Sequence, residues 1–218
     1  MGFRRSSVLN RPTLLKLLLI LYIPVGMILL SVFVVSVQYD IPVSNFTRDP
    51  ADLTRSSPFL GIISNLSVLF WCSTAAICFF SFYVNKHKNF SYMAFFFLMS
   101  GLITSLLLCD DLFLLHERIF PQYFNWRQRY IYLSYASIVF IYLLMFREII
   151  FKTNFIVLAL AFCFFFLSIG VDCMVAKMGD FLPFYHLYED GFKLLGIVSW
   201  LGYFAETSFH AVVQPAGR

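Results

Sequence analysis

The sequence predicts an all-α protein, a polytopic transmembrane helical bundle with about six spans, and three observations carry that prediction. Of its 218 residues, 60% are hydrophobic and 13% are charged, whereas ordinary soluble domains are about a quarter charged. The apolar residues gather into long runs that short polar breaks separate. Because a soluble domain of this size could not bury so much apolar surface, the excess is expected to face lipid.

Each predicted span is a run of about 20 mainly apolar residues, the length that a helix needs to cross the hydrocarbon core. The fourth run is short and is expected to extend to Arg129 or Glu148, and the sixth is the least apolar. In chain order the runs are Leu14–Tyr39, Phe59–Val84, Tyr92–Leu115, Tyr130–Phe146, Phe155–Val175 and Tyr188–Val213. The expected organisation is a tail of residues 1–13, a six-helix transmembrane domain of residues 14–213, and a tail of residues 214–218.

Charge predicts the orientation and the partners of the chain. The N-terminal tail, the second loop and the fourth loop carry Lys and Arg on one side, so both termini are expected to be cytoplasmic. The basic residues behind the net charge of +4 lie at the ends of apolar runs, where they anchor spans rather than bind nucleic acid. The expected partners are the lipid bilayer and a lipid substrate, with no nucleic acid and with protein partners left open.

One cluster of ionisable residues lies at the end of the third run and comprises Asp110, Asp111, His116 and Glu117. Ionisable groups in or near hydrocarbon are costly, so they usually face a protein interior or water. At about 100° per residue, Asp110 and Glu117 are expected on nearly the same stripe of one helix. The short Asp side chain cannot reach the interface as Lys or Arg can, which favours a functional role for Asp110 and Asp111.

A second cluster opens the sixth run. If that helix begins near Pro183, a residue type favoured in the first turn, His186 has Glu189 at i+3 and Asp190 at i+4 on one face. In the predicted topology both clusters, together with Asp172, reach the same outer side of the membrane.

Together the clusters predict a metal or proton-handling site, because carboxylates and imidazoles suit zinc, iron or manganese. The expected metal ligands are Asp110, His116, His186 and Glu189, and the expected catalytic acids and bases are Asp111, Glu117 and Asp190. The competing interpretation is structural. Glu189 and Lys193 form an ordinary i, i+4 pair, and acidic residues stabilise a helix N-terminus.

The strings DDLFLLHE (Asp110–Glu117) and EDGFKLLG (Glu189–Gly196) resemble the paired signatures of an uncharacterised bacterial multipass membrane family. That resemblance implies that the two clusters belong together, and it favours a bacterial cell membrane. The chain is also distantly similar to the alkaline ceramidase-like superfamily of membrane hydrolases, which has several spans and a zinc site of His with Asp and Ser. It departs from that superfamily because only His116 and His186 lie on the expected site face.

The sequence leaves three functions open and does not decide whether the protein is an enzyme. The first is a metal-dependent enzyme that acts on a lipid substrate near the outer face. The alternative is a non-catalytic membrane assembly or partner-binding subunit, in which the clusters hold helices together. Ion or proton transport is less favoured, because the span centres offer little beyond Ser, Thr and Cys.

Overall fold

The structure, a computed structural model, describes residues 11–86, 92–178 and 184–213, and these residues form helices joined by turns and short loops. The helices are α1 (Arg11–Tyr39), α2 (Ser44–Thr47), α3 (Pro50–Leu53), α4 (Ile62–Lys86), α5 (Tyr92–Phe113), a π-helix (Leu115–Ile119), α6 (Phe120–Phe124), α7 (Gln128–Lys152), α8 (Phe155–Met178) and α9 (Tyr185–Val213). The chain divides into two compact units, Met1–Leu60 and Gly61–Arg218, and each is described by itself.

The predicted fold class is confirmed. Within the described ranges, five helices are long and apolar enough to cross a membrane, namely Leu18–Tyr39, Ile62–Lys86, Tyr92–Phe113, Arg129–Lys152 and Phe155–Val175. The more polar α9 has 29 residues, which gives it a length of about 43 Å, and it packs along both α8 and α4. The chain is therefore an integral membrane protein, an all-α polytopic bundle of five to six spans.

Several helix boundaries differ from those that the sequence predicts. The third span ends at Phe113 rather than Leu115, and the fourth extends at both ends, with a kink at Phe146. The last helix begins at Tyr185, while Pro183 lies outside the described residues. Residues 1–10 of the predicted N-terminal tail and all of residues 214–218 also lie outside them, so the single domain of residues 14–213 stays a prediction.

The first unit consists of the long apolar helix α1 and two short polar helices. At the end of α1, the Ser36 hydroxyl donates a hydrogen bond to the Ile41 carbonyl at 2.6 Å, which closes the turn. The short helix α3 has Pro50 in its first turn, and the Asp49 carboxylate caps it by accepting from the Ala51 amide at 2.7 Å. The cap and the proline mark the start of this helix as helix propensities predict.

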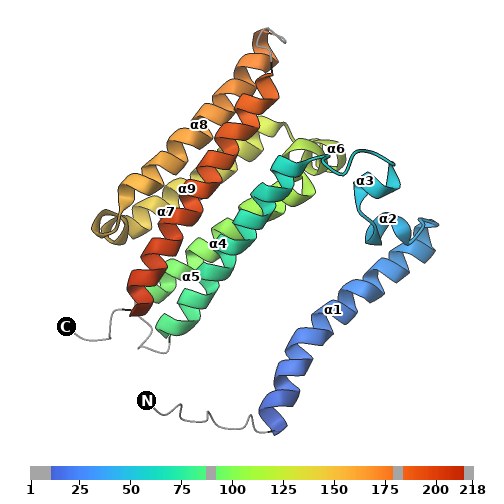
Figure 1. Ribbon diagram of the computed structural model, residues 1–218, viewed down its shortest axis with the longest axis horizontal. Coiled ribbons are helices and arrows are strands. Elements are labelled where there is room, and N and C mark those ends of the chain that lie inside the picture. Colours follow the sequence, from blue (N-terminus) through green and yellow to red (C-terminus); the bar gives the residue numbers. More distant parts are fainter. Residues whose placement is uncertain (1–10, 87–91, 179–183, 214–218) are drawn as a thin grey trace. The chain divides into compact units, whose positions relative to one another are not determined.

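The second unit is a bundle of five long helices. Figure 1 shows α9 running beside α8 and α4, and α4 in turn packs along α5. Helix α7 makes fewer contacts, but it touches α5 on one side and α8 on the other. The order α5, α4, α9, α8, α7 therefore closes on itself, and the loosely packed α7 leaves space inside the ring.

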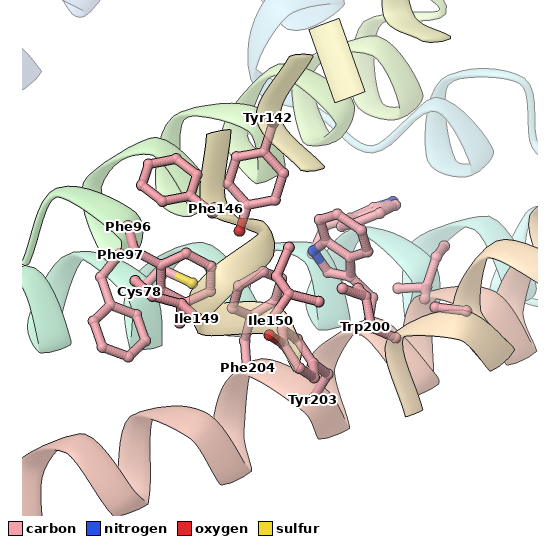
Figure 2. Close-up of a cluster of buried hydrophobic side chains, with 14 residues drawn as sticks. Cys78, Phe96, Phe97, Tyr142, Phe146, Ile149, Ile150, Trp200, Tyr203 and Phe204 are labelled. Atoms are coloured by element: carbon pink, nitrogen blue, oxygen red, sulfur yellow. The ribbon is translucent and has the colours of Figure 1, made fainter. Parts of the chain in front are cut away.

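Aromatic side chains fill one part of this bundle (Figure 2). The buried cluster draws on α4, α5, α7, α8 and α9 and includes Trp71, Phe96, Phe97, Tyr142, Phe146, Trp200, Tyr203 and Phe204. Buried polar atoms in it are paired across helices: Ser100 and Tyr142 share a hydrogen bond of 2.7 Å, and the Trp200 indole donates to Thr104 at 3.1 Å. Such bonds contribute about 0.6 kcal/mol each on average in membrane proteins, so packing supplies most of the cohesion.

We predict that Gly196→Ala destabilises the bundle by about 1–3 kcal/mol, the usual cost of overpacking. A Cβ atom at Gly196 would lie 2.6 Å from the Phe165 ring, and that ring cannot yield freely because it stacks on Trp71. Thermal unfolding of the detergent-purified protein measures the effect. The control is Gly170→Ala, where no atom lies within 4 Å of the added methyl group; equal thermal stability of the two variants would contradict this account of helix approach.

Candidate functional site

A cavity of about 1400 Å³ lies inside the ring of helices in the second unit. Along α8 its lining runs from Val175 to Ala159, sixteen residue steps and so about 24 Å of helix. The far end is apolar, and its lining includes Trp71, Leu107, Leu143, Phe162, Phe165, Phe166 and Trp200. Polar and charged side chains gather at the other end, so the cavity has two chemically distinct compartments.

All the site residues predicted from the sequence line this one cavity, and Asp172 joins them. The predicted residues are Asp110, Asp111, His116, Glu117, His186, Glu189 and Asp190. The helices explain the convergence, because the ends of α5 and α8 and the starts of α7 and α9 meet at the same end of the bundle. Their individual roles as ligands or catalytic groups stay predictions.

Asp110 is the most fully bonded of these residues. Its Oδ1 accepts hydrogen bonds from the Tyr135 hydroxyl at 2.9 Å and from the His116 backbone amide at 3.0 Å. Its Oδ2 lies 2.5 Å from Nδ1 of the His116 ring. The side chains of Asp110 and His116 are 11% and 12% exposed, so the pair is nearly removed from solvent. A carboxylate on Nδ1 fixes the ring orientation and directs Nε2 toward other groups.

The chain bends sharply between Asp110 and His116. Helix α5 ends at Phe113, Leu114 adopts a left-handed conformation with φ of 52°, and a π-helix follows. A non-glycine residue in this region costs about 1–2 kcal/mol, and both this strain and π-helical turns are often found at functional sites. The expectation that Asp110 and Glu117 share one helical stripe is therefore wrong, because the helix breaks between them.

Asp111 points to a different partner. Its Oδ1 accepts a hydrogen bond from the Lys193 ammonium group of α9, while its buried Oδ2 has no hydrogen-bond partner among the described residues. The Asp111 side chain is 6% exposed and that of Lys193 is 33% exposed. The pairing of Lys193 with Glu189, which the i, i+4 spacing suggests, gives way to this contact between two helices.

The second cluster is more open. His186 Nδ1 lies 3.9 Å from a Glu189 carboxylate oxygen, so the i, i+3 spacing does bring the two together, but the His186 side chain is 73% exposed. Across the described ranges, no three His, Cys, Asp or Glu side chains are grouped so that they could hold a metal ion. The expected set of metal ligands, Asp110, His116, His186 and Glu189, therefore finds no support, because it divides between two separate contacts.

Two tyrosines of α7 belong to the site but were not predicted from the sequence. Tyr135 bonds Asp110, and the Tyr132 ring lies with its centre 5.0 Å from that of His116. Asp172, Glu117, Asp110 and Glu189 all lie close enough to interact electrostatically with Tyr132. Tyr132 and Tyr135 are three residues apart on α7, and this i, i+3 spacing places both rings on one face of the helix. In a chain with 12 tyrosines, that spacing alone does not separate these two from the others.

The polar compartment carries an excess of negative charge. Among the described side chains, two cationic ones, Lys193 and Arg118, line the cavity together with the two histidines. The carboxylates are six, namely Asp110, Asp111, Glu117, Asp172, Glu189 and Asp190. Even with both histidines protonated, carboxylates would outnumber cations, so a positively charged group would be attracted to this end of the cavity.

Comparisons with known proteins give one match. A family model described as a domain of unknown function, DUF8692, matches residues 18–207, which cover most of α1 and almost the whole second unit. No curated protein and no solved structure matches the chain.

We predict that Lys193→Met destabilises the protein by about 3 kcal/mol, the lower end for a broken buried ion pair because Lys193 keeps a third of its side chain exposed. The double variant Lys193→Met/Asp111→Leu should recover most of this loss, since no buried charge then lacks its partner. Thermal unfolding in detergent measures both, and the control is Lys152→Met, at the far end of α7. A double variant no more stable than Lys193→Met would contradict the inferred pairing.

We also predict that neutral His116 carries its proton on Nδ1. Because Asp110 Oδ2 faces Nδ1, the carboxylate selects this tautomer. Nitrogen NMR of the labelled full chain in detergent, with His116→Gln for assignment, reports the tautomer directly. Asp110→Asn should remove the preference, whereas Tyr135→Phe should preserve it, because that change removes only a hydroxyl donor to Oδ1. A proton on Nε2 in the unaltered protein would refute the assignment.

Proposed function

This chain belongs to the DUF8692 family, and we propose that it binds a lipid-like amphiphile in the cavity of its second unit and acts on the polar end of that molecule by acid–base chemistry. The observation that carries the proposal is the division of one cavity into an acidic compartment and an apolar one. Ligand sites are commonly concave and mostly apolar, with a few polar groups that fix the orientation of the ligand.

The dimensions support an amphiphile. The lining extends about 24 Å along α8, which exceeds the thickness of about 15 Å for one leaflet of the hydrocarbon core. Phe140 and Phe166 line the cavity and are also 61% and 72% exposed, so the space reaches the lipid-facing surface. A hydrocarbon chain could therefore pass into the cavity directly from the bilayer, with its polar group toward the acidic end.

Acid–base chemistry is supported by the Asp110–His116 pair. With Asp110 on Nδ1, His116 Nε2 would accept a proton from a water molecule as that water attacks the carbonyl carbon of an ester or amide at the polar end of the amphiphile. Asp110 would stabilise the imidazolium that forms, and as the C–O or C–N bond breaks His116 would return the proton to the alcohol or amine that leaves. A well-placed base of this kind contributes about 10²–10⁴-fold to rate. Asp110 is thus a positioning residue, and His116 is the catalytic one.

Two predicted catalytic roles change under this proposal. Glu117 lies 3.7 Å from His116 Nε2, where it would stabilise the imidazolium rather than act as the general acid or base. Asp111 is bonded to Lys193 and would position that residue. We further propose, from the bias of Lys and Arg, that the acidic end faces outward and both termini are cytoplasmic. The resemblance of the two signature strings to a bacterial multipass family supports a bacterial cell membrane.

A second function, a non-catalytic assembly subunit, is favoured by one specific observation. The contacts Tyr135–Asp110 and Lys193–Asp111 connect α5 to α7 and to α9, as expected for polar groups that hold helices together. On this reading the cavity would hold no amphiphile. The following measurement separates the two functions.

We predict that lipid co-purifies with the protein and is lost when the cavity is filled. The variant Ala136→Trp/Ala159→Trp places bulky rings in the lining of α7 and α8. If lipid must displace these rings at an overpacking cost of about 1–3 kcal/mol, the variant should bind lipid about 5- to 150-fold more weakly than the unaltered protein. Native mass spectrometry of protein released from micelles measures retained lipid.

The matched control is Leu133→Trp/Leu160→Trp, which alters exposed positions of the same two helices outside the cavity lining. It should retain lipid as the unaltered protein does. Absence of bound lipid in the folded, unaltered protein, or equal retention by both double variants, would favour the assembly subunit instead.

A further inference from the structure

We infer that the acidic compartment is a binding site for a positively charged ammonium group, so that the amphiphile is a cationic lipid-like molecule that carries this group beside the ester or amide bond to be hydrolysed. The inference rests on the proposed function, because it assigns the headgroup of the molecule that the cavity would hold. Four features of the compartment support it.

The first is charge. Among the side chains that the structure describes, the compartment presents six carboxylates against two cationic side chains, and one of those cations, Lys193, is already bonded to Asp111. An anionic headgroup such as a phosphate would meet this negative potential without a cluster of cations to offset it. A cationic headgroup would instead relieve the repulsion of the Glu189 carboxylate by its neighbours Asp172 and Asp190.

The second feature is an aromatic surface beside these carboxylates. Tyr132 lines the cavity, and its hydroxyl lies within electrostatic range of the Asp172, Glu117 and Glu189 carboxylates. Tyr185 lines the same compartment from the start of α9. Aromatic faces attract cations through the ring quadrupole, and proteins recognise quaternary ammonium groups by such aromatic cages. A surface of tyrosine and carboxylate therefore fits an ammonium group in both shape and charge.

The third feature is an unpartnered atom. Asp111 lines the cavity, and 6% of its side-chain surface is exposed. Its Oδ2 accepts no hydrogen bond from the described residues. A buried carboxylate oxygen without a donor is costly. A primary ammonium group bound in the compartment would supply an N–H donor to this carboxylate, whereas a quaternary ammonium group has no N–H and would contribute only its positive charge.

The fourth feature is continuity with the apolar compartment. From Lys193, α9 continues for seven residues, about 10 Å, to the buried Trp200, which lines the apolar end. An ammonium group at the carboxylates would thus have its hydrocarbon chain directed into the aromatic compartment. A small cation such as Na⁺ would leave that compartment without an occupant.

The test uses the full chain purified in a detergent with a neutral sugar headgroup. Three probes with the same sixteen-carbon chain are compared by equilibrium binding: hexadecyltrimethylammonium, hexadecyl phosphate and hexadecanol. We expect saturable binding of the ammonium probe and at least about tenfold weaker binding of the other two, the ratio that corresponds to about 1.4 kcal/mol.

Two pairs of variants locate the headgroup. Tyr132→Phe should bind the ammonium probe as the unaltered protein does, because the ring face remains, whereas Tyr132→Leu should bind about 5- to 30-fold more weakly, as the loss of a cation–π contact of about 1–2 kcal/mol implies. Asp172→Asn/Glu189→Gln should also weaken binding. Glu148→Gln, an exposed carboxylate of α7 outside the cavity lining, should leave it unchanged.

The outcomes separate the two proposals. If all three probes bind equally and Ala136→Trp/Ala159→Trp displaces them, the cavity holds an amphiphile but the ammonium assignment is refuted. The assignment also falls if the phosphate probe binds best, or if Tyr132→Leu and Tyr132→Phe are alike in affinity. If no probe binds the folded protein, the proposed function fails together with this inference.

Discussion

Two adjacent carboxylates inside a membrane bundle, Asp110 and Asp111, impose the constraint on which the surrounding structure depends. A charged carboxylate in low-dielectric surroundings needs donors, and two consecutive residues on a helix point in different directions. Asp110 therefore draws its donors from Tyr135 and His116, whereas Asp111 draws on Lys193. These contacts connect the end of α5 to the starts of α7 and α9, and they determine which helix ends meet around the cavity.

The break at Leu114 follows from the same constraint. Had α5 continued, the His116 amide would have bonded within the helix, and its ring would have pointed away from Asp110. The left-handed turn instead brings both the amide and the ring nitrogen of His116 to one carboxylate. Backbone bonds from Arg118 and Ile119 to the Leu114 carbonyl, at 2.8 and 3.2 Å, help to offset the strain. Loss of regular helix at Leu114 thus allows Asp110 to fix the orientation of the His116 imidazole.

Loose packing of α7 gives this polar arrangement its space. The aromatic core holds α4, α5 and α9 together through contacts such as Trp71 with Trp200 and Phe96 with Phe204. On the other side, α7 reaches the core through Tyr142, Phe146, Ile149 and Ile150, and the helix is kinked at Phe146. Close packing of one part of the ring and sparse packing of another leave a cavity that is apolar where it meets the core and acidic where the helix ends converge.

The sequence by itself determined the membrane class, the helices and the candidate residues. A helix that crosses lipid needs a long apolar run, and an ionisable group within such a run costs enough free energy that its presence indicates a special role. The sequence also indicated that Asp110 to Glu117 and His186 to Asp190 belong at one end of the bundle, since short loops make successive spans antiparallel. Only the tertiary structure decided the partners. The helix break at Leu114 removed Glu117 from the stripe of Asp110, Lys193 bonded Asp111 rather than Glu189, and Tyr132 and Tyr135 entered from another helix. Partner choice depends on distances between segments far apart in the chain, which periodicity within one helix does not contain.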